Sequence, residues 1–154
     1  MAAVISNYIL KNGRMVRFAL GGYRGTLLTS KHENSVAYDT NLGYIRDRKQ
    51  DCEALIIVDA ISRKYFTGET SWLWDIDFDL LDCPQVKRVL LCGKYVHDLA
   101  MRFDYTGIPA EKVVCYDTVS QAVGALEQDG GGELYVVTCF SDRDKLLNLV
   151  KLEQ

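Results

Sequence analysis

Four short runs of consecutive apolar residues constrain the fold of this 154-residue chain more than any other feature. They lie within residues 53–59, 86–92, 112–116 and 133–139. Such runs, rich in Val, Ile and Leu, are typical of strands that are buried on both faces of a parallel sheet. Most of the stretches between them carry the spacing of amphipathic helices. This alternation predicts an α/β fold with a Rossmann-like, mainly parallel sheet and helices on both of its faces.

A β-hairpin is expected to precede the alternating part of the chain. Residues 15–20 alternate as a strand does, residues 21–25 are rich in glycine and indicate a turn, and residues 26–29 supply the returning strand. Residues 1–11 are expected to hold a short helical leader. Because the length suits one domain and 48% of the residues are apolar, we expect a single domain over residues 1–154.

Four helices are expected around the buried strands. The first two lie within residues 31–50 and 95–105, and the third begins at Asp117 or Thr118. The last begins at Ser141, because Ser141 and Asp144 have the spacing of a capping box. The apolar stripes of the four helices are Tyr38, Leu42 and Ile45, then Val96, Leu99, Ala100 and Phe103, then Val119, Ala122, Val123 and Leu126, and finally Leu146, Leu147 and Val150.

Charge and cysteine content exclude several classes of function. The net charge of −3 and the sequence pI near 5.4 argue against nucleic acid and against anionic membranes as partners. No apolar run approaches the roughly 20 residues of a transmembrane segment. The five cysteines include no C-x-x-C pair and have no ligand spacing with His32 or His97, so no metal site is expected. We expect reduced, buried thiols, of which Cys92, Cys115 and Cys139 lie in apolar runs, and a cytoplasmic location.

The usual nucleotide and nucleophile motifs are missing. The chain has no G-x-x-x-x-G-K-[ST], no G-x-G-x-x-G after a strand and no G-x-S-x-G. Gly93, between Cys92 and Lys94, could help to hold a phosphate at a helix start, but a glycine there more often serves a turn. In a parallel sheet, ligands bind beyond the carboxyl ends of the strands. Here those ends are Asp59, Gly93, Tyr116 with Asp117, and residues 138–141.

Residues 67–79, T-G-E-T-S-W-L-W-D-I-D-F-D, hold both tryptophans of the chain. Neither a helix nor a strand gives this stretch a clean apolar side. We interpret it as a loop that leads into a short turn of helix and is fixed by the indoles of Trp72 and Trp74. The alternative is that the two indoles fill a small core of their own and the acidic groups are solvated. For the tryptophans, packing is the favoured role.

Glu69 is the candidate catalytic residue of this stretch. A carboxylate held in such a loop can orient a histidine and stabilise its imidazolium, the third role in a nucleophilic triad. The chain offers no matching nucleophile and histidine, so these partners would come from another chain. The alternative is a carboxylate that caps a helix or is solvated. Asp75 and Asp77 are expected to accept hydrogen bonds from backbone N–H groups of the turn, and Arg102 is expected to pair with Asp98 on a solvated helix face.

Several motifs together resemble one family. Residues 68–79 match the pattern D-x-S-W-I-W-D-x-D-F-E, residues 12–15 match N-G-R-M, and residues 93–107 match G-x-R-A-x-D-M-A-x-R-L-K-Y-A-G. Residues 28–31 and 134–141 align with two further stretches of that family. From residue 12 onward the chain therefore resembles the C-terminal domain of MurT, the Mur-ligase-like subunit of lipid II isoglutaminyl synthase.

This resemblance implies the fold of a Mur ligase C-terminal domain and a role in a complex. In that family the partner is GatD, a class I glutamine amidotransferase that supplies a cysteine and a histidine, and MurT supplies the acidic third member in trans, at the position of Glu69. The complex amidates the D-glutamate of lipid II. It uses ATP and Mg²⁺ in a Mur ligase domain, so no cofactor is expected on this domain alone, while a GatD-like subunit and lipid II are the expected partners. The expected substrate- or partner-binding residues are Lys31, Asp59, Ser71, Asp75, Gly93 and Ser141.

The chain departs from the family pattern at three predicted strand ends. The family's K-N-P-A-G is K-H-E-N-S at residues 31–35, its L-N-D-N is V-D-A-I at residues 58–61, and its P-x-Y-T is T-C-F-S at residues 138–141. These losses favour an alternative function, a non-catalytic, stand-alone binding module with the same fold. An independent enzyme is the third hypothesis.

Overall fold

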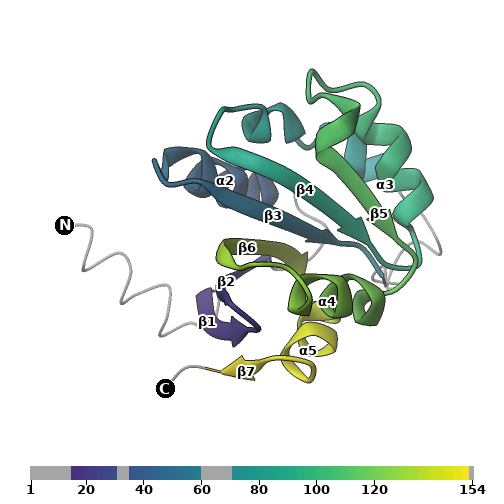
Figure 1. Ribbon diagram of the computed structural model, residues 1–154. Helices are drawn as coiled ribbons and strands as arrows, with labels where there is room; N and C mark the ends of the chain where they lie inside the picture. Colours follow the sequence, from purple (N-terminus) through teal and green to yellow (C-terminus); the bar gives the residue numbers. More distant parts are fainter. Residues whose placement is uncertain (1–14, 31–34, 60–70, 153–154) are drawn as a thin grey trace.

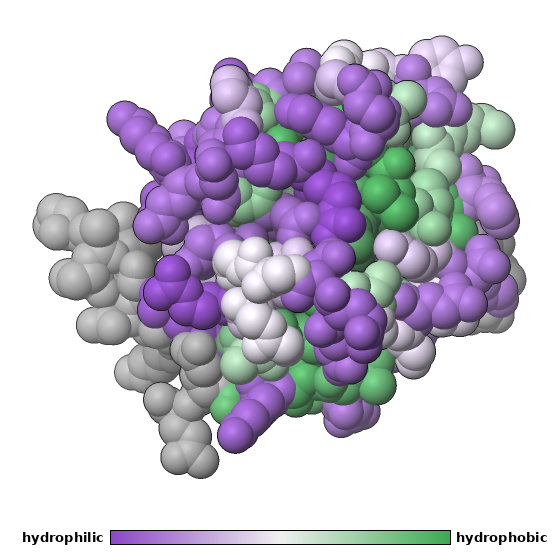
Figure 2. All heavy atoms as spheres, in the orientation of Figure 1, coloured by the Kyte–Doolittle hydropathy of each residue, from purple (hydrophilic) through white to green (hydrophobic). Residues whose placement is uncertain are grey.

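The computed structural model describes residues 15–30, 35–59 and 71–152, and of Ser71 it describes the backbone. The helical leader expected at residues 1–11 lies outside the described residues. No helix in these ranges has the length and apolar content needed to cross a bilayer. Hydrophilic side chains cover most of the face seen in Figure 2.

The strands of the described residues form one seven-stranded sheet (Figure 1). Its order is β5-β4-β3-β6-β2-β1-β7. The five strands from β5 to β2 run parallel to one another, while β1 is antiparallel to both β2 and β7. The bounds are β1 (Met15–Leu20), β2 (Tyr23–Ser30), β3 (Cys52–Ile57), β4 (Val86–Cys92), β5 (Val113–Tyr116), β6 (Gly132–Cys139) and β7 (Lys151–Leu152).

Helices cover both faces of the sheet. The first face carries α2 (Ser35–Asp47), α3 (Val96–Phe103) and the 3₁₀ turns η1 (Ser71–Asp75) and η2 (Phe78–Leu81). The second face carries α4 (Val119–Glu127) and α5 (Phe140–Leu147). A third 3₁₀ turn, η3 (Ala110–Lys112), precedes β5. Figure 1 shows α4 and α5 on the near side of the strands and α2 behind them. The α/β fold that the sequence predicts is confirmed.

Each central strand contributes to two separate cores. In β3, Ala54 and Ile56 pack into the core under α2 and α3, whereas Leu55 and Ile57 pack into the core under α4 and α5. Successive side chains of a strand point to opposite faces, so a strand covered on both sides needs apolar residues at every position. This requirement is the physical reason for the continuous apolar runs. The predicted helical stripes are also buried, with the exception of Ala100, Leu147 and Val150, which are half-buried.

Three expected boundaries are wrong. The hairpin loop is Gly21-Gly22 alone, because Leu20 already pairs with Tyr23, and Gly21 has the positive φ of 56° that such a tight turn demands. The run at 133–139 is not the last strand, since β7 follows it at the edge of the sheet. Finally, α5 begins at Phe140 with no side-chain cap, so Ser141 lies inside the helix and forms no capping box.

The cysteines that the structure describes form no disulfides, and most of them are enclosed by the fold. Burial raises the pKa of Cys52 to about 11 and that of Cys92 to about 12, so both stay protonated and unreactive at neutral pH. Cys115 is an exception, because β5 is an edge strand and its thiol is exposed. The expectation that Cys115 is buried is therefore wrong.

Gly25 provides a test of the packing between β1 and β2. It lies opposite Phe18, and a Cβ on Gly25 would stand 2.2 Å from the Phe18 ring. Gly25→Ala should therefore destabilise the protein by about 1–3 kcal/mol, since the ring and both strands are enclosed. Urea denaturation monitored by circular dichroism measures this change.

Gly43 is the matched control, because a Cβ there would meet nothing within 4 Å and the residue lies inside α2. Gly43→Ala should stabilise the protein by roughly 0.5–1 kcal/mol. Equal effects of the two substitutions would contradict the proposed packing of Phe18 on Gly25.

Candidate functional site

The carboxyl ends of β3 and β6 form the point at which the chain changes faces. These strands are neighbours in the sheet. After β3, the next helical turns within the described residues are η1 and η2, and they pack on the first face. By contrast, α5, which follows β6, packs on the second face. In open α/β sheets, the crevice at such a switch point is the usual place of a ligand site. The sequence places Asp59 just after β3 and Asp142 just after β6.

Asp59 is held by three groups, of which two lie on α5 and one in the turn after β4. Its backbone N–H donates to Oδ2 of Asp142 at 2.9 Å, and its Oδ1 accepts from the backbone N–H of Lys94 at 2.7 Å. The ammonium of Lys145 donates to Oδ2 of Asp59 at 2.5 Å and to Oδ1 of Asp142 at 3.1 Å. The ends of β3 and β4 and the first turns of α5 are therefore tied together by one cation and two carboxylates.

Asp142 is the buried member of this cluster. Its exposed fraction is 0%, whereas side chains of this type are almost never fully buried unless they are paired. The ammonium of Lys145 and the backbone N–H of Asp59 supply that pairing. Next to it, the thiol of Cys139 and the hydroxyl of Ser141 lie 2.9 Å apart, and the same thiol donates to Asp142 at 3.8 Å.

Electrostatic interactions keep Asp59 and Lys145 in their charged forms. Partial burial alone would raise the pKa of Asp59, but the hydrogen bonds from Lys145 and from the backbone of Lys94 outweigh it and lower this pKa below its ordinary value. Burial would likewise lower the pKa of Lys145, and the two carboxylates outweigh it and raise this pKa. Both groups are therefore charged across the physiological range.

Gly93 has a packing role at the same edge. Its φ is 114°, and a Cβ would stand 2.4 Å from the carbonyl oxygen of Val58. The backbone N–H of Tyr95 donates to that same oxygen at 3.1 Å. The backbone just after β4 thus packs directly against the backbone just after β3, and only glycine fits this close approach. The geometry agrees with the interpretation of Gly93 as a turn residue. The N–H of Lys94, which a phosphate would use, donates to Asp59.

A cavity of about 330 Å³ opens beside this cluster. It lies where the first turn of α4 meets the end of α5, and Thr118 caps α4 by accepting a hydrogen bond from the N–H of Gln121. Its lining residues are Asp59, Thr118, Val119, Ser120, Lys145, Asn148 and Leu149. The cavity is small, and its lining includes the carboxylate of Asp59, the ammonium of Lys145 and the first turn of α4.

The structure brings some of the expected site residues together and separates others. Asp59, Gly93 and Ser141 share the carboxyl edge of the sheet. Asp75 is exposed on η1, on the first face. Lys31 and Glu69 lie outside the described residues, as does the side chain of Ser71.

Sequence reasoning missed Asp142 and Lys145, which complete the cluster around Asp59. Their spacing of three residues directly after a buried strand was the available signal. It places both side chains on the same side of the following helix, at the switch point.

The motif stretch at residues 71–82 is fixed by a buried arginine. Arg102 of α3 is only 9% exposed, its Nε donates to the carbonyl of Leu73 at 3.1 Å, and a terminal nitrogen donates to the carbonyl of Ile76 at 2.7 Å. The expectation that Arg102 pairs with Asp98 on a solvated face is wrong. Arg102 instead adds a charged donor to each of two carbonyl groups that also accept from backbone N–H groups of the same stretch.

Acidic side chains fix the same stretch from outside. The backbone N–H of Asp77 donates to Oδ1 of Asp39 on α2 at 2.7 Å, and Oδ1 of Asp79 accepts from the N–H of Gly107 at 2.8 Å. Asp77 itself makes no capping hydrogen bond with its side chain. The expected role of a turn-fixing acceptor therefore belongs to Asp79 and Asp39 rather than to Asp77.

The two tryptophans of the motif have different environments. Trp72 is half-buried, and its ring centroid lies 5.5 Å from that of Tyr38 in the first core. Trp74 is 47% exposed, and its ring centroid lies 5.1 Å from that of Tyr105. The expected packing role is confirmed for Trp72, whereas Trp74 presents about half of its surface to solvent.

Replacement of Lys145 tests the cluster at the switch point. Lys145→Met should destabilise the protein by about 1–2 kcal/mol near neutral pH, because it removes the cation from the buried Asp142 and the half-exposed Asp59. Since the pKa of Asp59 is lowered by folding, the stabilisation is present above its unfolded value of about 3.9 and is lost as the pH falls. The stability difference between wild type and variant should therefore shrink below about pH 4 in thermal melts.

Lys87→Met is the control for Lys145, because Lys87 faces Asp51 at 3.6 Å with both side chains well exposed. It should change the stability by less than about 0.5 kcal/mol. A Lys145→Met effect that is equally small, or one that does not vary between pH 3 and 7, would contradict the assigned ion pairs.

Replacement of Arg102 tests the fixation of η1. Arg102→Met should cost about 2–4 kcal/mol, because two enclosed carbonyl groups lose a charged donor. Arg102→Lys should restore part of this loss, since an ammonium cannot reproduce the two-armed geometry. Arg17→Met, at an exposed position of β1, is the control and should be nearly neutral. Urea denaturation would refute the assignment if Arg102→Met and Arg17→Met behaved alike.

Comparison with known proteins identifies the family. The family model described as MurT ligase C-terminal matches residues 32–142, which is more than half of the chain. The lipid II isoglutaminyl synthase (glutamine-hydrolyzing) subunit MurT of Streptococcus pneumoniae is 25% identical over 130 residues, which are 84% of this chain and 28% of that protein. The chain thus spans little more than a quarter of the length of this relative. The resemblance seen in the sequence motifs is confirmed, and the chain belongs to the MurT ligase C-terminal family.

Proposed function

We propose that this chain acts as the C-terminal domain of a MurT-like subunit, which docks a GatD-like glutamine amidotransferase in the amidation of lipid II. The observation that carries the proposal is the family match, which includes the whole motif stretch at residues 68–79. The similar Streptococcus pneumoniae protein is by name a subunit of a glutamine-hydrolysing synthase. A subunit of this kind works with a second protein, and a glutaminase is the natural one.

In this proposal Glu69 is the positioning carboxylate for the histidine of the partner. A carboxylate beside that histidine fixes its tautomer and stabilises the imidazolium that forms when the cysteine nucleophile is activated. Glu69 precedes the first described residue of η1 by two positions. The fixation of η1 by Arg102 and Asp39 supports the proposal, because a group that positions a catalytic histidine has to be attached to a rigid element.

ATP and Mg²⁺ belong, in this proposal, to the Mur ligase domain of the assembly. Within residues 15–30, 35–59 and 71–152, no three or more His, Cys, Asp or Glu side chains are grouped to hold a metal ion. Lipid II would be met by the assembled complex. The carboxyl edge with Asp59 and Lys145 is the part of this chain that we propose for contact with the substrate.

A non-catalytic binding module is the second candidate, and one observation favours it. Asp59 is the strand-end carboxylate that the chain shares with the family pattern, and Lys145 and the N–H of Lys94 already occupy both of its oxygens. A carboxylate so engaged acts as a structural tie. Under this candidate the chain binds its partner without changing the rate of glutamine hydrolysis.

Glutaminase turnover distinguishes the two candidates. The GatD-like amidotransferase from the same genome is assayed alone, with the wild-type chain, and with the chain carrying Glu69→Gln or Glu69→Asp. Stimulation by wild type should fall on the order of 10²–10⁴-fold with Glu69→Gln, because the amide cannot stabilise the imidazolium. Glu69→Asp should retain most of it, since the family pattern has aspartate at this position.

Glu111→Gln, at an exposed position of η3, is the control with the same loss of charge and should stimulate as wild type does. The pH profile of the stimulated rate should also change with Glu69→Gln, which a purely structural role of Glu69 would not cause. Full stimulation by Glu69→Gln would refute the role of Glu69. Binding without any stimulation by wild type would favour the non-catalytic module.

A further inference from the structure

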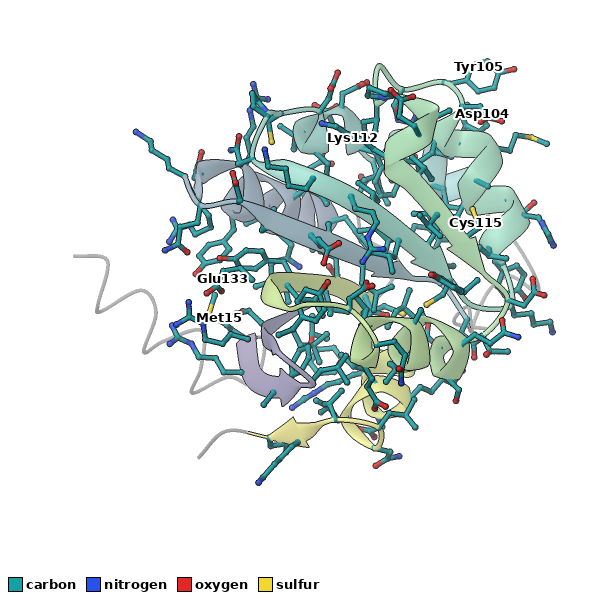
Figure 3. All side chains as sticks on the ribbon, in the orientation of Figure 1. Met15, Asp104, Tyr105, Lys112, Cys115 and Glu133 are labelled. Atoms are coloured by element: carbon teal, nitrogen blue, oxygen red, sulfur yellow. The ribbon has the colours of Figure 1, made fainter. Side chains whose placement is uncertain are left out.

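Three exposed apolar side chains gather on the outer face of η1 and α3. Trp74 is 47% exposed, Met101 is 58% exposed and Tyr105 is 73% exposed. The rings of Trp74 and Tyr105 touch edge to face at a centroid distance of 5.1 Å, and Met101, on α3, lies four positions before Tyr105 in the sequence. In Figure 3, the labelled Tyr105 points away from the fold. We call these three residues the Trp74 patch.

The Trp74 patch is rigid although it is exposed. Arg102 holds the carbonyls on either side of Trp74, those of Leu73 and Ile76, and its guanidinium lies 5.4 Å from the centre of the indole ring. The backbone of η1 is thereby fixed to α3, and the indole of Trp74 packs against the buried guanidinium of Arg102. Aromatic side chains that are ordered before binding lose little entropy when a partner covers them, and such residues dominate the affinity of many interfaces.

The surroundings of the patch are acidic. Between residues 71 and 86 the chain has four aspartates and no lysine or arginine. These aspartates are exposed, and Asp79 and Asp82 contact the turn at Gly107, close in sequence to Tyr105. Asp98 on α3 and Asp104 directly after it are also exposed, whereas the arginine of this helix is buried. The rim of the Trp74 patch therefore has a strong negative charge.

The negative charge of the rim determines which class of partner can bind the Trp74 patch. Two copies of the chain joined symmetrically at the patch would bring the same aspartates against each other, which opposes a homodimer. Nucleic acid and anionic lipid are repelled for the same reason. A protein surface with an apolar centre and a rim of Lys and Arg is complementary to it.

We propose that the Trp74 patch is the docking contact for the glutamine amidotransferase subunit, whose facing surface carries Lys and Arg around an apolar pocket. This inference rests on the proposed function for the identity of the partner. Trp74 of the patch lies on η1, which begins two residues after Glu69, so a subunit bound here would contact a segment that is close in sequence to Glu69. Trp74 and Tyr105 supply affinity, and the aspartates supply orientation and association rate.

The test is the affinity of the chain for the GatD-like amidotransferase from the same genome, measured by titration calorimetry. Trp74→Ala and Tyr105→Ala should each weaken binding by roughly 30-fold, the scale of a central interface residue. Tyr105 follows the end of α3 and is 73% exposed, so its replacement leaves the fold intact. Val36→Ala, at an equally exposed apolar position on α2, is the control and should bind as wild type does.

The charge of the rim is tested separately. Asp104→Asn should weaken binding several-fold at low salt and have little effect at high salt, because exposed charges are screened. Asp144→Asn on α5 makes the same change in net charge on the other face of the sheet and should not alter binding.

The outcomes separate this inference from the proposed function. If the wild-type chain binds and stimulates the amidotransferase but Trp74→Ala and Tyr105→Ala bind equally well, the patch is not the docking contact and the proposed function stands. If the wild-type chain does not bind at all, the proposed function is refuted and this inference with it. If sedimentation shows a homodimer that Tyr105→Ala dissociates, the patch joins two copies of the chain and our inference is overturned.

Discussion

The buried guanidinium of Arg102 provides the interactions on which the proposed docking face of this domain depends. From α3, Arg102 donates to the carbonyl of Leu73 in the short turn η1 and to that of Ile76 directly after it. Both carbonyl groups also accept from a backbone N–H group, so the loss of Arg102 would remove the charged donor from each of them and leave the weaker backbone hydrogen bond. The same guanidinium lies against Trp74 and holds that indole at the surface. One side chain thus makes a rigid platform from a segment that lacks regular helical structure.

A second group of ion pairs joins the carboxyl ends of β3 and β6. Lys145 bridges Asp59 and Asp142 where neighbouring strands send the chain to opposite faces. In many α/β proteins, a ligand binds in the crevice at this point of the sheet. Here a salt bridge fills part of that crevice, and a small cavity lies beside it. A crevice filled in this way agrees with our proposal that the domain works mainly through a partner.

The alternation of buried strands and helices could be predicted from the sequence, because a strand covered on both faces needs apolar residues at every position. The start of α5 could not, since Ser141 and Asp144 imitate a capping box inside a helix that follows β6 directly. Arg102 was assigned to Asp98 because they are neighbours on the helix. Its true partners are carbonyl groups 26 and 29 residues away in sequence, and side-chain patterns carry no record of backbone acceptors. Lys145 escaped notice for a different reason, because the topology of the sheet brings its partner Asp59 from a distant part of the sequence.

Hydrogen–deuterium exchange of the chain, free and bound to the amidotransferase, tests most directly the claim that the platform around Arg102 is the face at which this domain meets its partner. We predict that complex formation slows exchange in residues 71–82 and 96–105, while the amides of α4 and α5 keep their free rates. The segments η1 and α3 lie on one face of the sheet, and α4 and α5 lie on the other. Protection of one face is therefore distinguishable from protection of the other. Protection confined to α4 and α5, with η1 and α3 unchanged, would contradict the account.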